Sequence, residues 1–269
     1  MLFCILMLSK IIASIMLFFA TLFAPIPKPT PIPTPFNPFP YKMPIIQPNR
    51  SYLTYIVGDS MVNALGLNAN ILRLDLIKLY PNNEFVNYNY GFSSTNIESL
   101  PDRLNKETTF EGTKYPPILT QGFDLIIFES FAYNPLSQYP LADGLKKHDE
   151  ILDEAIKEIV MTHPNSIVAL MTPIAPNKEN FAKYTYKLSA EQRTQWVNER
   201  LAYIERYIEY AKERNLPLIN VYEKSLTPDG DGDLKYINKD DYIHPSKEGI
   251  ALMSQTIANF IYQNKIFPR

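Results

Sequence analysis

Two short motifs, far apart in the chain, carry the residue types of nucleophilic catalysis. The first is the Gly-Asp-Ser sequence at 58–60, which directly follows the apolar run 53–57, and the second places Asp241 three residues before His244. A serine on the turn after a strand is exposed at the edge of the sheet. A histidine can take its proton, and an aspartate can hold the imidazole in the required tautomer. The motifs therefore predict a Ser-His-Asp triad of Ser60, His244 and Asp241.

Each motif also has a purely structural interpretation. Ser60 could cap the N-terminus of a helix, which is a position that serine favours. Asp241 and His244 could belong to a capped loop before a helix that starts near Ser246. The other two histidines offer no better base, because His148 lies among charged residues of an expected exposed helix face and His163 precedes a proline in a loop.

The elements that must position these residues alternate along the chain. Apolar runs rich in β-branched residues predict strands, and apolar residues at helical spacing predict helices. The alternation implies a five-stranded parallel sheet between two layers of helices, and such sheets place their sites at the carboxyl ends of strands. The predicted strands are 52–57, 84–90, 123–129, 166–171 and 216–221, and the predicted helices are 63–80, 145–162, 190–214 and 246–262.

With these elements in place, the chain resembles the SGNH or GDSL hydrolases, a family of serine esterases and lipases with a flavodoxin-like three-layer α/β/α fold. The Gly-Asp-Ser block at 58–60 resembles the first motif of the family, and the Asp-x-x-His block at 241–244 resembles the last. The resemblance covers residues 51 to about 262. It implies ester hydrolysis through an acyl-enzyme, with no metal and no cofactor.

The resemblance also implies an oxyanion hole. Its donors would be the Ser60 N–H, the backbone N–H of Gly91 as the match to the second block, and the side-chain amide of Asn134 in the third block. The third block departs from the family pattern, because Ala132 and Pro135 stand where Gly and Asp are usual. Met61 likewise replaces the usual leucine of the first block.

Composition narrows the class of protein. The chain has 269 residues and 46% apolar residues, enough for one large core in residues 49–269. Residues 1–48 contribute three lysines and no acid, which leaves 23 basic and 28 acidic side chains in the remainder. That acidic balance argues against nucleic-acid binding. The single cysteine, Cys4, leaves no cysteine for a disulfide or a nucleophile in 49–269.

Residues 1–24 form an apolar segment whose only charged residue is Lys10. The stretch 11–24 suits the hydrophobic region of a signal peptide, and the whole segment is long enough to span a membrane if Lys10 snorkels. A cleavage site is poorly formed, since Pro25 follows Ala24. We therefore expect an uncleaved membrane anchor rather than a cleaved signal, and either places the rest of the chain outside the cytoplasm.

Residues 25–48 hold ten prolines in 24 positions, largely as a Pro-x repeat. Each proline removes a backbone donor and fixes φ, so we expect a linker that forms no packed structure. As a stalk it would hold the domain away from the bilayer, and as a plain leader it would have no role. A ligand for a proline-recognition domain is a third interpretation.

The sequence Asp-Gly-Asp-Gly-Asp at 229–233 resembles the start of a calcium loop. The sixth place of such a loop requires glycine for its sharp turn, and Leu234 stands there. We therefore interpret the segment as a turn-rich loop.

The function we expect is that of an extracytoplasmic serine esterase, tethered to the membrane, that removes short acyl groups from an envelope polysaccharide. A lysophospholipase, a general carboxylesterase or an acyltransferase would use the same triad. Because the third block is altered, a tethered binding module on a decayed hydrolase fold is the alternative without catalysis. Tyrosines 133, 139, 184 and 186 could line an acyl or sugar pocket, and packing in the core explains them equally well.

Overall fold

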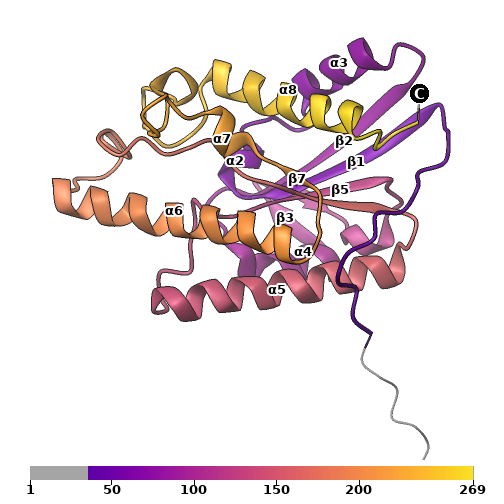
Figure 1. Ribbon diagram of the computed structural model, residues 1–269, viewed down its shortest axis with the longest axis horizontal. Helices are drawn as coiled ribbons and strands as arrows, with labels where there is room; N and C mark the ends of the chain where they lie inside the picture. The colour runs from indigo at the N-terminus through magenta and orange to yellow at the C-terminus, as the bar shows by residue number, and fades with distance from the viewer. Residues whose placement is uncertain (1–35, 269) are drawn as a thin grey trace, which may run out of the picture. The chain divides into compact units, whose positions relative to one another are not determined.

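The computed structural model describes residues 36–268, and its centre is a five-stranded parallel sheet with the strand order β2-β1-β5-β6-β7 (Figure 1). The predicted α/β/α fold is confirmed, and each predicted strand has a counterpart. The strands are β1 (Ser51–Gly58), β2 (Glu84–Gly91), β5 (Leu125–Glu129), β6 (Ile167–Met171) and the short β7 (Leu218–Ile219).

Helices cover both faces of this sheet. One face packs against α3 (Asn70–Leu79) and α8 (Lys247–Gln263), and the other packs against α4 (Leu100–Asn105), α5 (Leu141–Thr162) and α6 (Ala190–Glu213) (Figure 1). In β5, Ile127 points into the first core while Ile126 and Phe128 point into the second. A strand buried on both faces must be apolar at every position, which explains the continuous apolar run.

The predicted helix 63–80 is two helices in the structure. A four-residue helix, α2 (Ser60–Asn63), follows β1 directly, and α3 starts only at Asn70. Gly66 and Ala69 between them have φ values of 78° and 42°, which a continuous right-handed helix cannot accommodate. The break leaves α2 as a separate turn at the carboxyl end of β1.

Smaller elements connect the main ones. An antiparallel hairpin, β3 (Thr108–Phe110) and β4 (Thr113–Tyr115), was not predicted. Its Phe110 ring stacks on Phe92, with centroids 4.8 Å apart, just after β2. Within residues 36–268, the remaining elements are α7 (Val221–Lys224) and three short 3-10 helices at Ile97–Ser99, Ile118–Thr120 and Leu234–Tyr236.

The expectation that residues 25–48 form no packed structure is wrong for their second half. The compact unit begins at Asn37, and Tyr41 and Ile46 are buried in its core. The Tyr41 hydroxyl accepts a hydrogen bond from the Val168 N–H at 2.9 Å, and the Tyr41 N–H donates to the Arg214 carbonyl at 2.8 Å. Tyr41 thus accepts from a backbone N–H of β6 at a position that the short β7 does not reach. The proline content of the segment could not reveal this contact.

The predicted anchor at 1–24 lies outside the described residues. Within residues 36–268, no helix combines the length and the apolar character needed to cross a membrane.

Candidate active site

Ser60 stands at the carboxyl end of β1, as the first residue of α2. The helix cap is Asp59, whose Oδ1 accepts the Met61 N–H at 2.8 Å, so the capping role considered for Ser60 belongs to its neighbour. A Cβ on Gly58 would lie 2.5 Å from the Val62 side chain and 2.8 Å from Glu129 Cβ. Only glycine fits there, and this allows the sharp strand-to-helix turn that presents Ser60.

His244 and Asp241 form a tight pair in the loop before α8. The distance from His244 Nδ1 to Asp241 Oδ2 is 2.7 Å, and Asp241 Oδ1 accepts the backbone N–H groups of Ile243 and His244. Because a carboxylate accepts at Nδ1, the neutral imidazole carries its proton there and leaves Nε2 as an acceptor. The loop therefore holds the histidine in the tautomer that a general base needs.

Ser60 and His244 line one pocket of about 280 Å³. No hydrogen bond joins them in the described structure, and Nε2 of His244 has no other partner there. The sheet edge and the loop before α8 thus bring the two predicted motifs together. The pocket is lined by Ser60, Ser93, Ser94, Tyr133, Asn134, Phe181, Tyr186, Trp196, Arg200, Ile243 and His244.

Asn134 reaches this pocket from the loop after β5. Its Nδ2 donates to Asp59 Oδ2 at 2.9 Å, and its backbone N–H donates to the Phe131 carbonyl at 3.0 Å. An amide nitrogen carries two hydrogens, so one remains for a ligand in the pocket. The altered residues on either side, Ala132 and Pro135, therefore leave Asn134 at the site.

Gly91 is not among these lining residues, and the structure contradicts its expected role as an oxyanion donor. Its N–H donates to the Asn89 side chain at 2.7 Å and is already used. A Cβ at position 91 would lie 2.3 Å from the Asn63 nitrogen and 2.6 Å from the Val62 carbonyl carbon. Gly91 allows the end of β2 to approach the backbone of α2 closely, which is a packing requirement.

Ser94 is a candidate for the donor role that was expected of Gly91. It lines the pocket, its φ is 60°, and its N–H has no hydrogen-bond partner among the described residues. An oxyanion hole requires hydrogen-bond donors that are not already used, such as this N–H. No local pattern indicated this residue, because a positive φ is uncommon for serine and normally marks glycine.

Arg103, which sequence reasoning also missed, ties the strand ends around the site together. Its Nη1 donates to the carbonyls of Gly58 at 2.6 Å and Tyr90 at 2.7 Å, while its Nη2 donates to the hydroxyls of Thr95 and Ser99. Burial lowers the pKa of Arg103 to about 10, which keeps the guanidinium charged at neutral pH. It therefore holds the loop that carries Ser94.

Two buried carboxyls lie behind Ser60. Burial raises the pKa of Asp59, against the hydrogen bonds from Met61 and Asn134. Burial also raises the pKa of Glu129 well above its usual value, and the nearby Asp59 carboxylate raises it further. Glu129 accepts the Ser130 hydroxyl at 2.8 Å and the Phe131 N–H at 2.9 Å. It thus fixes the start of the loop that carries Asn134.

The expectation that His148 lies on an exposed helix face is wrong. Its side chain is buried beside the rings of Tyr203 and Tyr207, and its Nε2 lies 2.8 Å from the Ser130 carbonyl oxygen. The charged neighbours in sequence point elsewhere because a helix turns by about 100° per residue. The His163 side chain also has a backbone partner, because its Nε2 lies 2.9 Å from the Gln121 carbonyl oxygen.

The acidic loop at 229–233 closes on itself and on a neighbouring segment. Asp231 accepts from the Lys178 N–H and from Asn177 Nδ2, both at 3.0 Å, and Asp233 accepts the Lys235 N–H at 2.8 Å. Among the described residues, no three acidic, histidine or cysteine side chains gather as they would around a metal ion.

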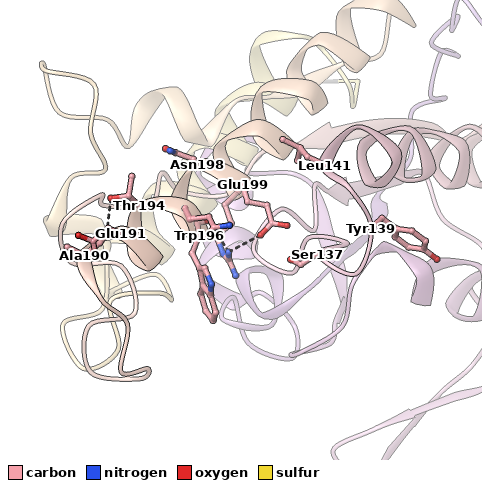
Figure 2. Close-up of a pocket in the computed structure, with 11 residues that line it drawn as sticks. Ser137, Tyr139, Leu141, Ala190, Glu191, Thr194, Trp196, Asn198 and Glu199 are labelled. Carbon is pink, nitrogen blue, oxygen red and sulfur yellow. Dashed lines mark hydrogen bonds and ion pairs between the residues drawn. The ribbon is translucent and has the colours of Figure 1, made fainter.

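A larger cleft of about 1030 Å³ adjoins the pocket and shares Trp196 and Arg200 with it. Figure 2 shows Ser137, Tyr139 and Leu141 on one side of this cleft and the first turns of α6 on the other. Of the tyrosines singled out from the sequence, Tyr133 and Tyr186 line the pocket and Tyr139 lines the cleft. Tyr184 lies outside both and contacts Tyr242.

Known structures share this fold. An acetylxylan esterase from Geobacillus stearothermophilus is 18% identical, with a TM-score of 0.52 over 80% of this chain and 95% of that chain. A GDSL-like lipase from Bacteroides thetaiotaomicron is 14% identical, with a TM-score of 0.52 over 79% and 88%. A protein from Desulfitobacterium hafniense assigned to the G-D-S-L family is 16% identical, with a TM-score of 0.55 over 79% and 99%. No protein-family model and no curated protein matches the sequence. At these identities the likeness establishes the fold.

Proposed function

We propose that this chain, which has the fold of GDSL-type lipases and acetylxylan esterases, is a serine ester hydrolase. The observation that carries the proposal is the Asp241–His244 pair, 2.7 Å apart, which opens onto the same pocket as Ser60. A serine needs such a base, because it is a weak nucleophile at its own pKa.

The reaction would follow from these positions. Ser60 Oγ attacks the acyl carbon, and His244 Nε2 takes the hydroxyl proton while Asp241 stabilises the imidazolium. The carbonyl oxygen becomes an oxyanion, for which the candidate donors are the N–H groups of Ser60 and Ser94 and the free hydrogen of Asn134 Nδ2. His244 then protonates the leaving alcohol, and a water activated in the same way releases the acid from Ser60.

The substrate we favour is a short acyl ester, such as acetate, on an envelope polysaccharide. The pocket at Ser60 is small, at about 280 Å³, while the adjoining cleft has room for a larger alcohol. The apolar segment 1–24 supports a location outside the cytoplasm, at the membrane surface.

Activity is tested with p-nitrophenyl esters of increasing chain length and the purified full-length chain. We expect acetyl and propionyl esters to be cleaved faster than octanoyl esters, and acetate to be released from acetylated glycans. In Ser60→Ala, turnover should fall by about 10³–10⁶ with an unchanged melting temperature. Hydrolysis that survives this substitution would refute the assignment of Ser60.

Location is tested by limited proteolysis of intact cells. We expect cleavage before Asn37, where the compact unit begins, to release a soluble active domain. Activity confined to the cytosolic fraction would contradict the proposed location.

A further inference from the structure

Arg200 is the cation at the junction between the pocket and the cleft. It projects from α6 and lines both spaces, and its guanidinium carbon lies 4.9 Å from the Phe181 ring centre and 5.1 Å from the Trp196 ring centre. Stacking on two rings holds the guanidinium in place without using its hydrogen-bond donors.

Most of these donors have no partner in the described structure. Nη1 donates to the Trp196 carbonyl at 2.9 Å, and it forms an ion pair with the Glu199 carboxylate at 4.0 Å, a distance beyond a hydrogen bond. Nε is buried with no acceptor. Nη2 has no hydrogen-bond partner among the described residues, but it is not one of the buried atoms. The side chain is only 12% exposed, so water screens the charge poorly. Arg103 also has a buried Nε with no acceptor, but its two terminal nitrogens donate to four oxygen atoms.

A buried guanidinium with unmet donors is unfavourable unless something else satisfies them. The residues that line the pocket at Ser60 include Arg200 but no aspartate or glutamate, and the carboxylate that pairs with Arg200, that of Glu199, lines the adjoining cleft. Burial lowers the pKa of Arg200, and the nearby Glu199 carboxylate opposes this only in part. Arginine nevertheless stays charged at neutral pH.

We infer that Arg200 binds an oxyanion, a carboxylate or a phosphate, on the alcohol part of the ester, so that the substrate is an acylated anionic glycan. The inference rests on the proposed function for the orientation of the ester. Because Arg200 also lines the cleft, a group bound to it would be on the leaving-alcohol side. The cleft offers an aromatic ring at Tyr139 and amides at Gln195 and Asn198, which suit sugar rings and hydroxyls, and it is also lined by the carboxylates of Glu191 and Glu199.

Binding can be measured without catalysis, because Trp196 is the only tryptophan of the chain and contacts Arg200. The full-length protein is titrated with tetragalacturonate, with its methyl ester and with inorganic phosphate, and tryptophan emission is followed. We expect a saturable change with at least one of the two anions, with an affinity about 10-fold or more above that of the neutral ester. Tetragalacturonate alone would indicate a carboxylate, and phosphate alone would indicate a phosphate group.

Three variants make the test specific. Arg200→Gln should abolish the preference for the anion, and Arg200→Lys should reduce it, because lysine keeps the charge but not the planar fork. Lys212→Gln removes one exposed positive charge from the same helix and should leave the preference intact. No saturable change with either anion, equal binding of the neutral ester, or a preference that survives in Arg200→Gln would overturn the inference.

Acetate release separates this inference from the proposed function. On acetylated tetragalacturonate and its methyl ester, the wild-type ratio of kcat/KM should favour the anion, and Arg200→Gln should bring that ratio close to one. A protein that binds the anion through Arg200 but releases no acetate from either form would support the anion site and contradict the hydrolase.

Discussion

Asn134 Nδ2 donates to Asp59 Oδ2 at 2.9 Å, which links the loop after β5 to the residue directly before Ser60. The same carboxyl caps α2 through Oδ1. One amide hydrogen of Asn134 therefore fixes the turn that presents Ser60, and the other has no partner among the described residues.

Asn134→Ala should reduce both stability and turnover because it removes both hydrogens. Asp59 would keep its bond to Met61 but lose the one from Asn134, and the free energy of unfolding should fall by about 1–3 kcal/mol. Loss of an oxyanion donor should slow acylation by about 10²–10³. Melting temperature and single-turnover acylation measure the two effects, and the exposed Asn68→Ala is the control. Near-normal acylation with lower stability would limit Asn134 to a structural role.

Asp241→Asn should impair catalysis while the loop keeps its shape. The amide oxygen can still accept the backbone N–H groups of Ile243 and His244, but the amide group can turn its NH₂ toward Nδ1 and favour the wrong tautomer. We expect kcat to fall by about 10⁴. Asp240→Asn changes the same charge one residue away on an exposed side chain and should have little effect. Similar losses in both variants would show that charge alone, and not the contact to His244, is responsible.

Gly91→Ala tests the packing role that replaces the expected oxyanion role. An added methyl group would lie 2.3 Å from the Asn63 nitrogen, and the backbone there cannot move without displacing α2. We expect a loss of about 1–3 kcal/mol in the free energy of unfolding, measured with denaturant. Gly122→Ala, where a methyl group meets nothing within 4 Å, should be close to neutral. A Gly91→Ala protein of normal stability would contradict the close approach of β2 to α2.

The buried His148 predicts a specific dependence of stability on pH. Burial lowers the pKa of His148 from 6.5 to about 4, so the unfolded chain binds this proton between those values while the folded protein does not. Stability is therefore lost as the pH falls from 6.5 toward 4, by on the order of 3 kcal/mol for this group.

Unfolding free energies at pH 7 and pH 4.5 should differ less for His148→Gln than for the wild type. The buried carboxyls Asp59 and Glu129 are present in both proteins, so their contributions cancel in the comparison. An identical pH dependence in the two proteins would show that His148 titrates normally in the folded state.

The arrangement of the main elements could be predicted from the sequence because burial leaves a local signature. The apolar runs that became β1, β5 and β6 are continuous because both faces of the sheet are covered. The break between α2 and α3 was missed, since it depends on backbone angles at Gly66 and Ala69. The proline-rich segment was misjudged from residue 37 onward, because tertiary contacts of Tyr41 and Ile46 override local composition.

The sequence by itself determined the residue types of the site and their order: Ser60 after a strand, Asn134 after another, and Asp241 three residues before His244. These residues can be identified locally, because each short motif places its side chains on a single turn. Only the tertiary structure decided which backbone N–H groups and which guanidinium N–H groups near the site have hydrogen-bond acceptors. The N–H of Gly91 donates to the Asn89 side chain, and the N–H of Ser94 has no partner among the described residues. Arg200 keeps a buried N–H without an acceptor at the edge of the pocket. Hydrogen-bond partners and burial depend on segments distant in the chain, so no local pattern could reveal them.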